Sequence, residues 1–162
     1  MRQRMAASLL AVLPTLAFAQ TLAPKPSAVQ YITVVATPSV ASAAPGSAVT
    51  LWVDVTPKPG VHVYASDSQG TKPVALVLTP RAGVTAGKPK LPPAEMIKTV
   101  GTTETVAAYR KPFRIEQPVT IAPTAKAGEA VTIAGVVNYQ ACDDAVCYPP
   151  GAVPLSWTVT VK

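Results

Sequence analysis

The sequence predicts an all-β protein, an antiparallel β-sandwich of the immunoglobulin-like class. Eighteen prolines are spread along the 162 residues and leave few stretches of helical length between them. The intervening segments are rich in Val and Thr, which favour strands. In residues 47–55, apolar and polar side chains alternate, as they do in a strand with one buried face. Short strands separated by turns at this spacing are typical of a sandwich.

Seven segments are expected to form strands. In residues 47–55, the alternation directs Val49, Leu51, Val53 and Val55 into the core. Pro118 leaves open whether residues 110–121 form one bent strand or two. The proline-rich segment 88–93 should be irregular, and Trp52 and Trp157 should pack in the core. The predicted strands are residues 30–36, 47–55, 61–65, 74–79, 110–121, 130–140 and 153–161.

The N-terminus has the three-part pattern of a secretory signal peptide. Arg2 and Arg4 precede a mostly apolar run over residues 6–16, and Ala17-Phe18-Ala19 then forms an A-x-A cleavage site. The run is too short to span a membrane and contains a proline. The sequence therefore predicts a signal peptide at 1–19, a flexible lead-in at 20–28 and one domain at 29–162. We expect a periplasmic protein without stable membrane insertion after cleavage.

The charge pattern argues against nucleic-acid binding. The net charge is +6, but the basic residues are dispersed along the chain and are not interleaved with aromatic residues. Dispersed charges of this kind are typical of a solvated surface. We therefore expect no nucleic-acid partner.

The two cysteines, Cys142 and Cys147, carry the most informative chemistry. They follow the predicted strand 130–140 and precede Tyr148-Pro149-Pro150, which should turn the chain. With four residues between them they can close a small disulfide ring, and an exported protein is in a compartment where disulfides persist. A chain of this length can build a core without a disulfide. From these residues alone, a permanent structural disulfide and a working redox couple both remain open.

The neighbours of the cysteines suggest how they would react. Asp143 and Asp144 place two negative charges beside the first sulfur, which should raise the pKa of its thiol. We therefore expect the reduced form to be held mostly as thiols. With His62 as the only histidine, the cysteines fall short of a closed zinc set. The sequence predicts no metal site and no other cofactor.

The segment Tyr139-Gln140-Ala141-Cys142 … Cys147-Tyr148-Pro149-Pro150 resembles the N-terminal periplasmic domain of the thiol:disulfide interchange protein DsbD. That family carries a Y-Q-x-C … C-Y-P-P signature on an immunoglobulin-like sandwich. Residues 59–64 (PGVHVY) resemble a family segment with aromatic side chains near the cysteines, and residues 118–121 and 127–128 resemble the strand and turn before the cysteine strand. The likeness extends over residues 29–162.

The resemblance implies an electron shuttle that exchanges disulfides with thioredoxin-fold redox proteins. It assigns Cys147 as the sulfur that forms mixed disulfides and Cys142 as its resolving partner. The chain contains neither the family's transmembrane relay nor its thioredoxin-like domain. We therefore expect a component of a protein-disulfide reductase that lacks its own electron source and depends on a separate membrane electron donor. The alternative is a secreted immunoglobulin-like binding domain with a purely structural disulfide.

The chain departs from the family in two places near the cysteines. The family has five residues between the cysteines, where this chain has four. The family also covers its disulfide with a cap loop, which corresponds here to residues 100–109. His62 is expected to be a surface or half-buried residue, with proton acceptance near the thiolate as the alternative. The residues expected to line the site are His62, Tyr64, Glu104, Val106, Tyr109, Tyr139, Asp143, Asp144 and Tyr148.

Overall fold

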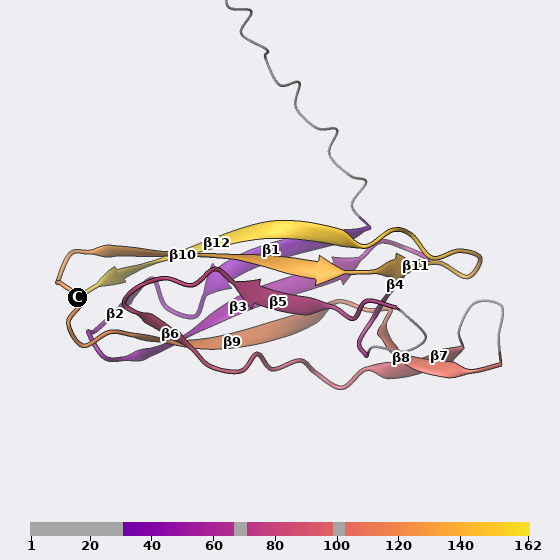
Figure 1. The fold of residues 1–162 in the computed structure, drawn as a ribbon, viewed down its shortest axis with the longest axis horizontal. Helices are drawn as coiled ribbons and strands as arrows, with labels where there is room; N and C mark the ends of the chain where they lie inside the picture. Colours follow the sequence, from indigo (N-terminus) through magenta and orange to yellow (C-terminus); the bar gives the residue numbers. More distant parts are fainter. Residues whose placement is uncertain (1–30, 67–70, 99–102) are drawn as a thin grey trace, which may run out of the picture.

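The computed structural model describes residues 31–66, 71–98 and 103–162 (Figure 1). The signal peptide and the lead-in lie outside these residues and stay predictions. Within the described part of the chain every regular element is a strand, so the all-β prediction is confirmed. The strands are β1 (Ile32–Pro38), β2 (Ser42–Ala43), β3 (Ala48–Pro57), β4 (His62–Tyr64), β5 (Ala75–Leu78), β6 (Val84–Ala86), β7 (Glu95–Lys98), β8 (Thr105–Tyr109), β9 (Phe113–Ile121), β10 (Ala130–Tyr139), β11 (Ala141–Cys142) and β12 (Gly151–Val161).

Two four-stranded sheets form the body of the molecule. One has the strand order β1-β3-β9-β6, and the other has the order β2-β12-β10-β5. All pairings within them are antiparallel except the short parallel pair between β2 and β12. The side chains Val49, Leu51, Val53 and Val55 of β3 are buried, as the alternation predicts. They pack in one core with residues of β10 and β12, which makes the molecule a sandwich.

A third, smaller sheet with the order β11-β4-β8-β7 forms one end of the sandwich. Figure 1 shows it at the end opposite the C-terminus, where β10 leads into β11. Because β4 follows β3 and β11 follows β10, this end sheet continues one strand from each main sheet. Cys142 is the last residue of β11, so the core strands hold the first cysteine in a fixed position.

Each predicted strand corresponds to an observed one within a few residues, whereas β2, β6, β7, β8 and β11 were not predicted. Residues 110–121 contain one strand, β9, in spite of Pro118. The carbonyl of Pro118 accepts hydrogen bonds from the Gly87 amide and the Gln117 side chain, so the missing N–H interrupts only part of the ladder. The predicted cap stretch 100–109 lies outside the described residues at 100–102, and from Thr105 onward it is the strand β8 rather than a loop.

The two tryptophans occupy different environments. Trp157 is 2% exposed in the main core, and its indole N–H donates to the Trp52 carbonyl at 3.2 Å. The prediction that Trp52 packs in the core is wrong, because the alternation of β3 directs its side chain to the outer face. There the guanidinium of Arg114 lies 4.6 Å from the ring centroid and forms two hydrogen bonds with Asp54.

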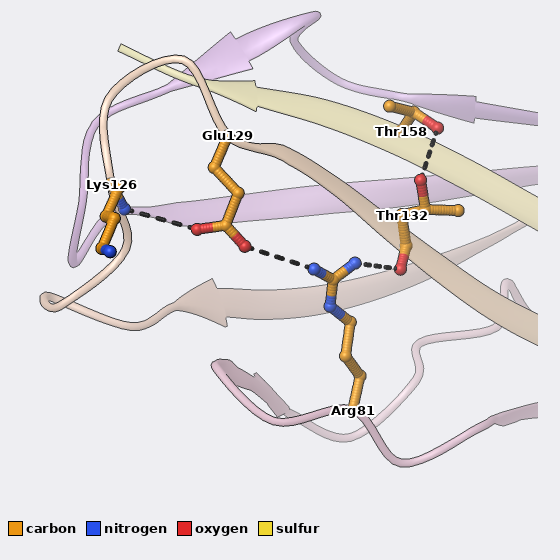
Figure 2. A network of polar contacts seen from close by, with 5 residues as sticks. All are labelled: Arg81, Lys126, Glu129, Thr132 and Thr158. Atoms are coloured by element: carbon orange, nitrogen blue, oxygen red, sulfur yellow. Dashed lines mark hydrogen bonds and ion pairs between the residues drawn. The ribbon is translucent and has the colours of Figure 1, made fainter.

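A polar network joins the segment after β5 to the start of β10 (Figure 2). Arg81 donates to the Thr132 carbonyl and forms an ion pair with Glu129 at 3.4 Å. Glu129 also accepts from the Lys126 amide, and the hydroxyls of Thr132 and Thr158 lie 3.3 Å apart. Exposed ion pairs of this kind contribute little to stability. The network fixes the loops at the end of the sandwich away from the cysteines.

Candidate functional site

The cysteines form a disulfide that is buried at one end and exposed at the other. The Cys142 and Cys147 sulfurs are bonded at 2.11 Å, and the two residues also form an isolated antiparallel bridge. Cys142 is 0% exposed, whereas Cys147 lies at the surface on the loop that follows β11. Val146, the residue before Cys147, is 51% exposed. A partner could therefore reach this disulfide from the Cys147 side.

The buried side of the disulfide contacts a small apolar cluster within the end sheet. Its members are drawn from all four strands of that sheet: Tyr64, Ile97, Val106, Ala108 and Cys142. This cluster is separate from the main core. The apolar surroundings exclude water from the Cys142 sulfur, which disfavours a charged thiolate there.

Tyr64 is the polar group closest to the sulfurs in the cluster. Its hydroxyl oxygen lies 3.3 Å from the Cys142 sulfur and 3.5 Å from the Cys147 sulfur. Sulfurs in a disulfide carry no proton, so the hydroxyl is the donor in both contacts. Burial raises the pKa of Tyr64, which keeps this proton on the oxygen. The hydroxyl is thus placed to donate to whichever sulfur becomes a thiolate.

The loop between the cysteines is organised around Asp143. One carboxylate oxygen accepts from the Ala145 and Val146 amides, each at 2.8 Å, and the other accepts from the Tyr148 hydroxyl. The Tyr148 ring stacks on Tyr31 with centroids 3.8 Å apart. The carboxylate therefore holds the loop in one conformation and joins it to the residue before β1. The expectation that Asp143 raises the thiol pKa stays a prediction.

We expect the Asp143 contacts to be lost only in strong acid. The Tyr148 hydroxyl, followed by the two loop amides, lowers the pKa of Asp143 below its usual 3.8. A depressed carboxyl pKa stabilises the folded loop above that usual value, and the stabilisation disappears as pH falls through the folded-state pKa. In an NMR titration, the Ala145 and Val146 amide signals should shift only below pH 3.8. Signals that move at higher pH would contradict the assignment, and Asp143→Asn should abolish the shift.

His62 and Asp144 lie on another side of the disulfide. His62 pairs in register with Cys142, and Asp144 has a 90% exposed side chain that lies 3.7 Å from Arg110. A pocket of about 120 Å³ is lined by His62, Arg110 and Asp144, together with Gly60 and Val61. The prediction of a surface or half-buried His62 is wrong, because the side chain is 2% exposed and packs against the Tyr64 ring on the face that it shares with Cys142.

Two of the remaining predicted site residues, Tyr139 and Tyr109, belong to the main core rather than to the cluster around Cys142. The Tyr139 ring is buried in the main core beside Gly151, and its hydroxyl accepts from the Tyr31 amide at 3.1 Å. Tyr109 also belongs to the main core, where it stacks on Phe113 and donates to the Pro92 carbonyl. Both tyrosines support the strands beneath the site. Glu104 is exposed immediately before β8.

The residues at the site that were not among those predicted include Ile97, Ala108, Arg110 and Gln140. Ile97 of β7 belongs to the apolar cluster around Cys142. The Gln140 side chain accepts from the Lys72 amide at 2.9 Å and donates to the Tyr148 carbonyl at 3.2 Å. Gln140 thereby connects the loop after Cys147 to the segment before β5. Its place in the Y-Q-x-C pattern is the sequence signal for this role, whereas Ile97 has no signal before the strand pairing is known.

The fold and the site together define a β-sandwich domain that carries a disulfide with one accessible cysteine at its end. The family model of the thiol:disulfide interchange protein DsbD, N-terminal, matches residues 30–154. The chain belongs to this family, and its immunoglobulin-like sandwich agrees with that membership. Among the described residues, no helix is long and apolar enough to cross a membrane.

Solved structures similar to the chain include three bacterial proteins. The Neisseria meningitidis DsbD N-terminal domain, crystallised in the reduced form, is 21% identical with a TM-score of 0.46, over 74% of this chain and 81% of that one. The N-terminal periplasmic domain of ScsB from Proteus mirabilis is 13% identical with a TM-score of 0.46, over 80% and 45%. The Escherichia coli fimbrial subunit AggA is 13% identical with a TM-score of 0.40, over 84% and 99%. Comparison with curated proteins finds no match.

Proposed function

We propose that this domain is a thiol–disulfide exchange module that passes electrons between thioredoxin-fold proteins in the periplasm. The observation that carries the proposal is the asymmetry of the disulfide, with Cys147 at the surface and Cys142 fully buried. Exposed disulfides are the labile and catalytic ones, whereas structural disulfides resist reduction. The sandwich has its own extensive core, so the disulfide is not needed to hold the fold together.

The exposure of the two cysteines supports the proposed assignment of their roles. A partner thiolate attacks the Cys147 sulfur, the Cys142–Cys147 bond breaks, and Cys142 leaves as a thiolate that is then protonated. A second partner thiolate attacks the partner sulfur of the mixed disulfide, which releases Cys147 and leaves the partner oxidised. Two electrons have then entered the domain. The reverse sequence reduces the disulfide of another partner.

The surroundings of the sulfurs suit such a step. The Tyr64 hydroxyl can strengthen its hydrogen bond as Cys142 leaves, because hydrogen bonds to charged groups are about twice as strong as neutral ones. Val146, Pro149 and Pro150 are exposed close to Cys147 in the chain and offer apolar surface that a partner can cover. The apolar cluster around Cys142 and the ordered Asp143 loop hold the two sulfurs in position.

The cellular setting belongs to the same proposal. Export through the signal peptide at 1–19 would place the domain in the periplasm, where its disulfide can form. A separate membrane protein would supply its electrons. In this arrangement the domain acts as one component of a protein-disulfide reductase.

The proposal is tested by exposing the oxidised protein to a reduced thioredoxin. Free thiols are alkylated at intervals, and the mass increase counts them. We expect two alkylated cysteines in the protein and an equal amount of oxidised thioredoxin. A disulfide that remains intact in the folded protein would refute the proposed function. The double variant Cys142→Ser/Cys147→Ser is the matched control, because it leaves the thioredoxin reduced.

A further inference from the structure

His62 is a buried titratable side chain in strand β4 of the end sheet. It is 2% exposed, and its Nε2 atom has no hydrogen-bond partner among the described residues. A buried polar atom in this state costs stability, and such atoms are uncommon in folded proteins. A residue that only filled space at this position could be apolar, as its neighbour Val63 is. The imidazole therefore calls for a chemical explanation.

The fold places His62 beside the buried sulfur. His62 and Cys142 are directly opposed in the β4–β11 pair, so their side chains leave the same face of the sheet with Cβ atoms about 5 Å apart. Tyr64, two residues further along β4, lies on that face and contacts the Cys142 sulfur. The rings of His62 and Tyr64 meet edge to face, with centroids 5.6 Å apart.

His62 also faces a route to water. It lines the pocket of about 120 Å³ whose rim carries the exposed Arg110 and Asp144 side chains. This volume holds a few water molecules, since each occupies about 30 Å³ in the liquid. Cys142, by contrast, is fully buried and has no direct access to solvent. The imidazole thus belongs to the residue opposite Cys142 in the strand pair and also lines a pocket that can supply or accept protons.

We propose that His62 is the proton acceptor and donor for Cys142 during disulfide exchange. The proposal rests on the proposed function and adds the path of the proton. When Cys147 is bonded to a partner sulfur, the Cys142 thiol gives its proton to the neutral imidazole, and the resulting thiolate attacks the Cys147 sulfur. The Cys142–Cys147 bond forms, and the partner sulfur leaves with the bonding electron pair as a thiolate. His62 then releases the proton through the pocket, and the partner thiolate takes one up from solvent.

The charges around His62 suit a base that is neutral at physiological pH. Burial, and then Arg110, lower the pKa of His62 below its usual 6.5, while Asp144 and Asp143 oppose the shift. Among the described residues, Tyr64 and Cys142 are further titratable groups beside it. A neutral imidazole has one nitrogen with a free lone pair, which can accept the thiol proton. Protonation of His62 in acid would remove this acceptor.

The test follows the two steps of oxidation separately, with glutathione disulfide as the probe. Reduced protein is mixed with an excess of the probe, quenched with acid at intervals and weighed by mass spectrometry. The mass distinguishes the mixed disulfide on Cys147 from the closed Cys142–Cys147 disulfide. The rate of the second step, in which the mixed disulfide becomes the closed Cys142–Cys147 disulfide, should rise with pH through the pKa of His62 and then level off. The pKa itself is measured on the same protein by NMR of the imidazole.

His62→Gln should leave the first step unchanged and slow the second about 100-fold at neutral pH, the lower end of what a positioned general base contributes. In this variant the rate of closing the Cys142–Cys147 disulfide should rise about tenfold per pH unit. The only route to the reactive Cys142 thiolate is then loss of its proton to solvent. Arg110→Gln removes a cation that lowers the His62 pKa, so the NMR and kinetic midpoints should both move to higher pH.

The proposal is overturned if the wild-type second rate shows no break at the measured His62 pKa, or if the kinetic midpoint of Arg110→Gln does not follow the NMR midpoint. The wild-type profile decides the matter even if His62→Gln does not fold. Because glutathione disulfide reports on the two sulfurs directly, the result is independent of whether thioredoxin-fold proteins are the partners. Failure of this proposal is therefore distinguishable from failure of the proposed function.

Discussion

Cys142→Ser should convert the domain into a trap for its partners. With the buried resolving thiol removed, a mixed disulfide formed at Cys147 has no internal nucleophile to break it. The serine hydroxyl fits the space of the thiol, so the apolar cluster that includes Tyr64 should remain folded. We expect the variant to form a stable covalent complex with a single-cysteine variant of a thioredoxin-fold protein, detected as a reducible band on a denaturing gel.

The matched control is Cys147→Ser, which keeps only the buried thiol. Cys142 is 0% exposed, so a partner sulfur cannot approach it without displacing the end sheet. We expect at least a tenfold lower yield of covalent complex, since access to the attacked sulfur controls exchange. Efficient capture by Cys147→Ser alone would reverse the roles assigned to the two cysteines.

Trp157→Ala should destabilise the fold more than any substitution at the site. The indole is 2% exposed in the main core, and its N–H donates to the Trp52 carbonyl. Truncation of a buried tryptophan costs about 3–5 kcal/mol of the free energy of unfolding. Chemical denaturation followed by circular dichroism measures the loss. A variant that unfolds in the absence of denaturant agrees with the prediction, because the cost approaches the total stability of many domains.

Trp52→Ala is the control for that measurement. This side chain is half-buried on the outer face, where it lies beneath the Arg114 guanidinium. Cation–π contacts at exposed sites contribute about 0.5–1 kcal/mol, so the variant should remain folded with a small loss of stability. Equal losses for the two tryptophans would contradict the assignment of Trp157 to the core and Trp52 to the surface.

The strands that build the main sheets are predictable from local patterns. The alternation in residues 47–55 predicts both the strand β3 and its buried face, because the period of two is a property of every strand. The same rule places Trp52 outside the core, where side-chain size alone suggests the inside. Its outer position is stabilised by Arg114, which is distant in the sequence and adjacent in the β3–β9 pair.

The end sheet is less predictable, and so are the residues that depend on it. Its strands are two to five residues long, too short for a periodic pattern to emerge. Val106 could be expected near the cysteines from the family resemblance, whereas Ile97 reaches them only through the β7–β8 pairing. Successive side chains of a strand point to opposite faces, so Tyr109 does not face the cluster that contains Ala108. Its side chain enters the main core instead.

The roles of the residues between the cysteines are also only partly predictable from the sequence. Their composition indicates two negative charges beside a thiol. The structure distinguishes them, because Asp143 binds the loop amides and Asp144 extends toward Arg110. The surroundings of His62 likewise depend on the β4–β11 pairing, which brings Cys142 opposite it on the face that also carries Tyr64. Sequence order alone does not contain that pairing.

The reduction potential of the Cys142–Cys147 couple tests the central claim most directly. The folded protein is equilibrated with dithiothreitol buffers of defined potential, and the reduced fraction is counted by alkylation and mass spectrometry. An exchanging disulfide should have a potential above roughly −300 mV, within the range that thioredoxin-fold proteins can address. A potential below roughly −300 mV would identify a structural disulfide and contradict the proposed function.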